Sequence, residues 1–174
     1  MEACFHGLSS GLDPLSCYVG KPLLISSPQK IDIVDFPPVS KDSSVGIFLI
    51  NTGTTSKTGK LVLLFNEKLN SEKFRNILNT QIIPRNNNCI QAILEGKIRN
   101  FHDEMRLFSA LQLEYFAEMI PDEFREIWSN GINTRDYSLK LCGSGGGGYL
   151  LGFTGDIKGV EEYFYKQGTE LITV

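Results

Sequence analysis

The sequence of 174 residues has no excess of basic residues, no long apolar run and no paired-cysteine motif. Its 17 lysines and arginines are scattered and outnumbered by 20 acidic residues, so we expect no nucleic-acid partner. Apolar runs such as residues 45–50 are far too short to span a bilayer, so we expect no membrane segment. The first residues have neither the basic nor the apolar region of a secretory signal, which favours a cytoplasmic protein.

The four cysteines, Cys4, Cys17, Cys89 and Cys142, show none of the C-x-x-C spacing that would indicate a zinc site. Each lies in an apolar or strand-like setting, which favours reduced and buried thiols over disulfides and fits a cytosolic protein. The remaining composition is ordinary, with 41% hydrophobic and 21% charged residues. It is enough for one globular core.

Hydrophobic patterns and turn signals alternate along the chain as is typical of an α+β protein with a mostly antiparallel sheet and helices on one face. Apolar residues recur every three or four positions from Phe101 to Met119, which predicts one long helix with a stripe facing the core. The Pro- and Ser-rich stretch 37–44 predicts a boundary between residues 1–40 and residues 41–174. The other expected helices start at Asp13–Pro14 or cover residues 60–69, 71–78, 89–96, 122–131 and 156–168; the expected strands are 22–26, 30–36, 45–52, 137–142, 149–154 and 170–174.

The run GSGGGG, residues 143–148, lies between two of the expected strands. A chain reversal needs one or two glycines, and each additional glycine costs about 0.5–1 kcal/mol relative to alanine. Successive backbone N–H groups could surround an anion, or the backbone could approach another segment closely. The alternative is a disordered hairpin tip, and the glycine content alone does not decide between them. The run is neither a Walker A loop nor a G-x-G-x-x-G turn.

A second cluster of polar residues lies near the start of the chain. Glu2, His6, Ser10 and Asp13 fall within twelve residues, interleaved with glycines. Such a segment can present one carboxylate to a substrate hydroxyl while a second carboxylate holds a cation. Phosphoryl transfer requires these two functions, because the nucleophile must be positioned and Mg²⁺ must neutralise phosphate charge.

Three segments resemble the GHMP kinase superfamily, which includes galactokinase, homoserine kinase, mevalonate kinase and phosphomevalonate kinase. Residues 5–20, FHGLSSGLDPLSCYVG, look like the His-Gly-x-Pro/Ser-Ser-Gly-x-Asp segment of mevalonate kinases. Residues 140–153, KLCGSGGGGYLLGF, resemble the third signature of the superfamily, and residues 49–58, LINTGTTSKT, look like its strand that ends in Asn-Thr. The resemblance implies a ferredoxin-like C-terminal domain of the GHMP kinase fold, preceded by a remnant of the N-terminal domain. It also implies a kinase that uses ATP and Mg²⁺ to phosphorylate a small-molecule alcohol, with mevalonate, an isoprenoid precursor, as the expected acceptor.

The resemblance assigns a role to each matching residue. Asp13 would be the catalytic aspartate that orients the substrate hydroxyl, although an Asp before a Pro is also a helix N-cap. Glu2 would bind Mg²⁺, and His6 and Ser10 would line the substrate pocket, although His6 could equally be a structural hydrogen-bonding residue. Thr52 is a weaker candidate for contact with substrate or phosphate. The glycine loop would brace the ATP phosphate loop and touch phosphate through Gly143, Ser144, Gly145, Gly146 and Gly147.

The sequence also departs from the family pattern. The lysine-bearing substrate segment and the Pro-x-x-x-Gly-Leu-x-Ser-Ser loop that wraps the ATP phosphates at a helix N-terminus do not occur. We therefore expect a C-terminal portion of a kinase that is inactive by itself; a homodimer is compatible with this.

Three substitutions leave the acceptor open. Cys142 and Ser144 stand where the family has Thr/Ser and Ala, and Pro14 stands where mevalonate kinases have Asn. The alternative acceptors are a sugar, phosphomevalonate or another alcohol. An alternative from another class is a non-catalytic binding or regulatory module of the same fold.

Overall fold

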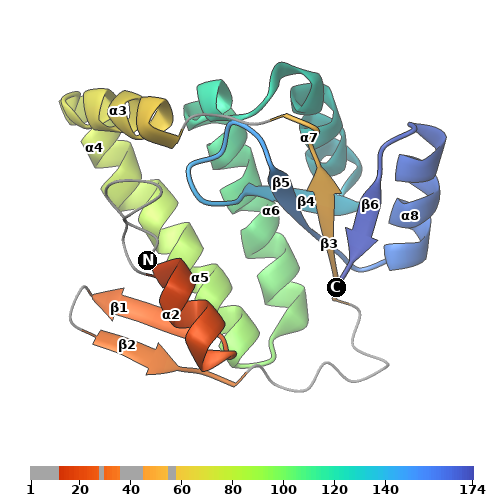
Figure 1. Ribbon diagram of the computed structural model, residues 1–174, viewed down its shortest axis with the longest axis horizontal. Coiled ribbons are helices and arrows are strands. Elements are labelled where there is room, and N and C mark those ends of the chain that lie inside the picture. The colour runs from red at the N-terminus through yellow and green to blue at the C-terminus, as the bar shows by residue number, and fades with distance from the viewer. Residues whose placement is uncertain (1–11, 28–29, 36–44, 55–57) are drawn as a thin grey trace. The chain divides into compact units, whose positions relative to one another are not determined.

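A computed structural model describes residues 12–27, 30–35, 45–54 and 58–174 (Figure 1). The chain forms two compact units, residues 1–38 and 39–174, which are described one at a time. Within the described residues, no helix combines the length and the apolar character needed to cross a bilayer.

The first unit contains helix α2 (Leu12–Val19) and an antiparallel hairpin of β1 (Leu23–Ser27) and β2 (Lys30–Ile33). Successive side chains of a strand point to opposite faces, and Ile25 pairs with Ile31 across the hairpin. Ile25, Ile31 and Ile33 are all exposed, so one face of this hairpin is apolar and accessible. The expected strand over residues 30–36 is shorter than the sequence suggested and ends at Ile33.

The second unit is built on a four-stranded sheet with the order β4-β5-β3-β6, in which all neighbours are antiparallel (Figure 1). The strands are β3 (Gly46–Asn51), β4 (Tyr137–Leu141), β5 (Tyr149–Thr154) and β6 (Leu171–Thr173). Helix α8 (Ile157–Lys166) connects β5 to β6. Chain order is thus strand, helices, strand, strand, helix, strand, with the first strand inside the sheet.

Besides the sheet and α8, the described second unit contains five α-helices and two short helical turns. They are α3 (Thr58–Leu69), α4 (Glu72–Ile77), the π-helical turn η1 (Leu78–Ile82), α5 (Ile83–Leu94), α6 (Ile98–Tyr115), the 3₁₀ turn η2 (Ala117–Met119) and α7 (Asp122–Thr134). The Ser71 hydroxyl caps α4 by accepting a hydrogen bond from the Phe74 amide (3.4 Å).

The helix predicted over residues 89–96 is part of a longer helical run. Helices α4 and α5 are joined through η1 into one segment, and the last helical residue is Leu94. Pro84 explains the π-helical turn, because its ring would clash with the Thr80 carbonyl in a regular α-helix and it has no N–H to donate. The sequence analysis expected two separate helices here, over residues 71–78 and 89–96.

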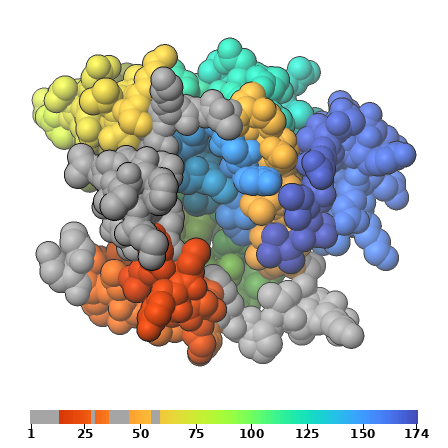
Figure 2. All heavy atoms as spheres, in the orientation of Figure 1, coloured from red at the N-terminus to blue at the C-terminus, as the bar shows by residue number. Residues whose placement is uncertain are grey.

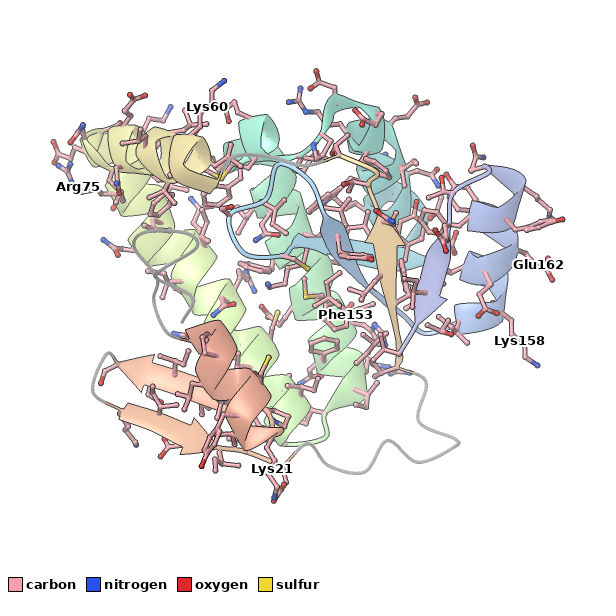
Figure 3. All side chains as sticks on the ribbon, viewed as in Figure 1. Lys21, Lys60, Arg75, Phe153, Lys158 and Glu162 are labelled. Atoms are coloured by element: carbon pink, nitrogen blue, oxygen red, sulfur yellow. The ribbon has the colours of Figure 1, made fainter. Side chains whose placement is uncertain are left out.

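The apolar stripe predicted over residues 101–119 is buried as expected. Phe101, Met105 and Phe108 of α6 lie in the core. The helix itself ends at Tyr115, and Met119 reaches the core from η2 instead. Near its start, helix α6 packs against β5, where the rings of Phe101 and Phe153 meet edge to face with centroids 5.1 Å apart (Figure 3).

Helices α7 and α8 pack on one face of the sheet. Phe48 and Ile50 of β3 are fully buried, and the Phe48 ring packs on Phe164 of α8. On the same face, the Tyr137 hydroxyl donates a hydrogen bond to the Ile127 carbonyl of α7 (2.7 Å). Phe153 points to the other face, where its ring meets Phe101 of α6, while Ile47, Leu49 and Leu151 on that face are only partly buried.

The outer surface of the second unit includes charged residues of α8 and part of β3. Lys158 and Glu162 point from α8 into solvent, as Figure 3 shows. On the side seen in Figure 2, β3 reaches the surface between β5 and β6.

Cys89 is buried, whereas Cys17 in the first unit is exposed, so the expectation of buried cysteines fails at Cys17.

Candidate functional site

The glycine run forms a loop between β4 and β5 that is fixed to two other segments by backbone hydrogen bonds. The Gly146 amide donates to the Met119 carbonyl at the end of η2 (2.6 Å). The Gly148 amide donates to the Thr54 carbonyl, just after β3 (2.7 Å). The disordered hairpin tip considered from the sequence is therefore wrong, because the loop is held on both sides.

Two of these glycines are required by close backbone approach. A Cβ atom at Gly145 would lie 2.6 Å from the Met119 carbonyl oxygen, and one at Gly147 would lie 2.5 Å from that of Thr54. Both residues also have positive φ angles, 74° and 149°, which side-chain-bearing residues rarely adopt. The excess of glycine thus permits the loop to lie against two neighbouring backbones.

Among the described residues, three amides of the loop have no acceptor. The N–H groups of Gly143, Ser144 and Gly147 make no hydrogen bond to any part of the chain that the structure describes. Successive free N–H groups on a backbone with positive φ angles form the kind of concavity that binds anions. The loop therefore combines fixed geometry with free donors.

Thr52 anchors the loop from the end of β3. Its backbone amide and its hydroxyl both donate to the Gly148 carbonyl, at 2.8 and 2.9 Å. The side chain is buried, and its Oγ1 lies 3.2 Å from that of Thr54. A buried hydroxyl that already has partners holds the loop in place, whatever else it contacts.

Cys142 precedes the loop as a partly buried, free cysteine. Burial raises the pKa of its thiol above the ordinary value, opposed by the positive charge of Lys140. The thiol is consequently protonated at neutral pH, and the side chain packs as a neutral group.

The other residues predicted for the site belong to the first unit. Glu2, His6 and Ser10 lie outside the described residues. The described part of α2 begins at Leu12, so the backbone of Asp13 lies in the first helical turn rather than one residue before it. In the described residues, no group of three or more His, Cys, Asp or Glu side chains is placed to hold a metal ion.

Sequence reasoning missed the two segments that hold the loop. The Met119 and Thr54 contacts use main-chain carbonyl oxygens, which leave no residue signature in a single sequence. The number of glycines was the only available signal, and it indicated a close approach without naming the partner. Gln112 was missed for a related reason: it lies within the apolar stripe of α6, where its side chain accepts a hydrogen bond from the Leu141 amide (3.0 Å).

Comparison with known proteins identifies a solved structure with a similar fold. No family model matches the sequence, and no curated protein matches it either. Among solved structures, the chain is similar to Streptococcus pneumoniae phosphomevalonate kinase in complex with phosphomevalonate and AMPPNP. The TM-score is 0.63 at 14% identity, and the match covers 83% of this chain and 43% of that one.

At this identity the similarity shows the fold alone. The chain shares the fold of the matching part of a GHMP kinase, as the sequence resemblance predicted. It spans less than half the length of that kinase. Mevalonate kinase in particular stays a prediction.

A matched pair of alanine substitutions tests the account of the loop. Gly143 and Gly145 both have positive φ, but a Cβ at Gly143 meets no described atom within 4 Å. Gly143→Ala should cost about 1–2 kcal/mol of backbone strain. Gly145→Ala should cost about 1–3 kcal/mol more, because the added methyl pushes against Met119. Urea denaturation measures both values, and equal losses of stability would contradict the close approach.

Proposed function

We propose that this chain is part of an ATP-dependent kinase of the GHMP superfamily that phosphorylates a small-molecule alcohol, with mevalonate as the first candidate acceptor. One observation carries the proposal: a glycine loop tethered by its backbone presents the N–H groups of Gly143, Ser144 and Gly147, which have no acceptor in the described part of the chain. Fixed N–H donors stabilise phosphate charge without reorganising during the reaction. Thr52 holds the loop in the geometry that this role requires.

The second unit supports the finer assignment of the fold. Its strand and helix order is β-α-β-β-α-β, with β3 and β5 in the middle of the sheet and β4 and β6 at the edges. This is the order of a ferredoxin-like domain, which we assign as the C-terminal domain of the GHMP kinase fold. The additional helices α3 to α6 are then an insertion after the first strand.

In this proposal the two polar segments divide the work of phosphoryl transfer. The loop amides neutralise phosphate charge, while Asp13, in the first turn of α2, orients the acceptor hydroxyl. The positive end of a helix dipole favours an ionised carboxylate there, so Asp13 contributes orientation and electrostatics more than strong basicity. His6 and Ser10 line the acceptor pocket.

A magnesium ion fits this residue set only in part. Mg²⁺ is commonly held by one or two carboxylates, with the substrate phosphates and water completing its coordination. Glu2 would supply that carboxylate, and the ion would neutralise the charge of the ATP phosphates. The other proposed roles, orientation of the acceptor hydroxyl and stabilisation of phosphate charge, belong to Asp13 and to the loop amides.

Asp13→Asn tests the catalytic assignment in the complete kinase polypeptide to which we assign this chain. The substitution keeps the size of the side chain, so the melting temperature and the affinity for AMPPNP should stay close to wild type. The turnover number kcat should fall by about 10²–10⁴-fold, the range of such contributions. A loss of thermal stability with unchanged turnover per folded molecule would make Asp13 a structural residue only.

The acceptor is tested separately by assaying mevalonate, phosphomevalonate, galactose and homoserine with ATP and following the products by ³¹P NMR. We expect mevalonate to give the highest kcat/KM. A preference for phosphomevalonate would favour that compound as the acceptor. The similarity to phosphomevalonate kinase is the reason for naming it as the alternative. Absence of any product would favour a non-catalytic module of the same fold.

A further inference from the structure

A partly open cavity of about 370 Å³ lies in the second unit beside the glycine loop. Its lining comes from α3, from Asn86 of α5, from α6 and η2, and from β4 and the start of the loop. The walls are mainly apolar: Leu61, Val62, Phe65, Phe108, Phe116, Met119 and Leu141. The size is within the range of small-molecule sites in proteins.

One end of the cavity is lined by polar groups with few hydrogen-bond partners in the described chain. Gln112 has only 9% of its surface exposed, and its Oε1 accepts the Leu141 amide, but its side-chain NH₂ has no acceptor in the described chain. This NH₂ is not among the described buried side-chain atoms that lack a partner, so it is accessible from the cavity and can donate to a ligand there.

Lys140 supplies a positive charge to the same lining. Its ammonium group donates to the Leu141 carbonyl (3.0 Å), and no described carboxylate lies within ion-pair distance of it. Ser144 contributes a hydroxyl group from the loop. The cavity thus joins an apolar body to a cationic, donor-rich end, which is complementary to an amphiphile with an anionic head.

We propose that this cavity is a binding site for a small amphiphilic carboxylate, with its hydrocarbon part between α3 and α6 and its head group at Gln112 and Lys140. The site goes beyond the proposed phosphoryl transfer, since it requires neither ATP nor an alcohol. Gly143 and Ser144 belong both to the cavity lining and to the glycine loop. An occupant therefore contacts the segment that carries the free amides.

Titration of the ¹⁵N-labelled 174-residue chain with decanoate below its micelle concentration tests this site by NMR. We expect saturable shifts of the Gln112 side-chain NH₂ and of the Gly143 and Ser144 amides. Decanol, which lacks the charge, should bind more weakly. An absence of saturable binding, or shifts confined to the exposed hairpin face around Ile25 and Ile31, would overturn the proposal.

Neighbouring residues of α3 supply a matched pair of variants. Val62 lines the cavity and is 46% exposed, whereas Leu63 is 64% exposed and does not line it. Val62→Phe should weaken decanoate binding about tenfold or more by filling the cavity, because small changes in apolar pockets alter affinity by 10–200-fold. Leu63→Phe adds the same ring one position away and should leave binding unchanged. Equal affinities of the two variants would contradict the site.

Gln112→Glu separates the head group from the apolar walls. The carboxylate can still accept the Leu141 amide, but it replaces the free NH₂ with a negative oxygen. Decanoate binding should fall while decanol binding stays the same. The ¹⁵N spectrum of each variant shows directly whether it is folded, and an equal loss for both ligands would contradict the assigned orientation.

Discussion

The contact of the glycine loop with two foreign backbones is the constraint on which the site depends. Gly146 is bound to Met119 and Gly148 to Thr54, so residues far apart in the sequence meet at one end of the sheet. The β3–β5 pairing brings Asn51 opposite Tyr149, which places the exit of β3 beside the end of the loop. Free amides on such a loop have fixed positions, unlike those of a flexible glycine linker.

The same constraint relates the fold to the sequence. Carbonyl oxygens of any residue can serve at positions 54 and 119, so the loop geometry needs glycines on one side only. A fold held in this way can persist while most side chains change, consistent with 14% identity at a TM-score of 0.63. The cavity beside the loop shows the opposite dependence, because its character rests on the particular side chains of Gln112, Lys140 and the apolar walls.

Much of the second unit was predictable from periodicity and capping. The β-strands, the Ser71 cap and the buried stripe of α6 follow from local patterns. Prediction failed where tertiary structure overrides them. The helices expected over residues 71–78 and 89–96 belong to one continuous run, in which Pro84 is accommodated by a π-helical turn. Gly131, expected near the end of its helix, lies inside α7, which ends where Arg135 takes a left-handed conformation (φ 67°). In the site, the loop was visible as a glycine run and Thr52 was a candidate, whereas Met119 and Thr54 hold the loop only through their carbonyl oxygens. Glu2, His6, Ser10 and the role of Asp13 stay predictions.

Hydrogen exchange of the loop amides, followed residue by residue by NMR, tests the central claim most directly. Hydrogen-bonded amides exchange only when the local structure opens, whereas free amides exchange at once. The account predicts strong protection of Gly146 and Gly148 together with rapid exchange of Gly143, Ser144 and Gly147. Uniformly rapid exchange across residues 143–148 would show that the loop is not tethered and would contradict the account.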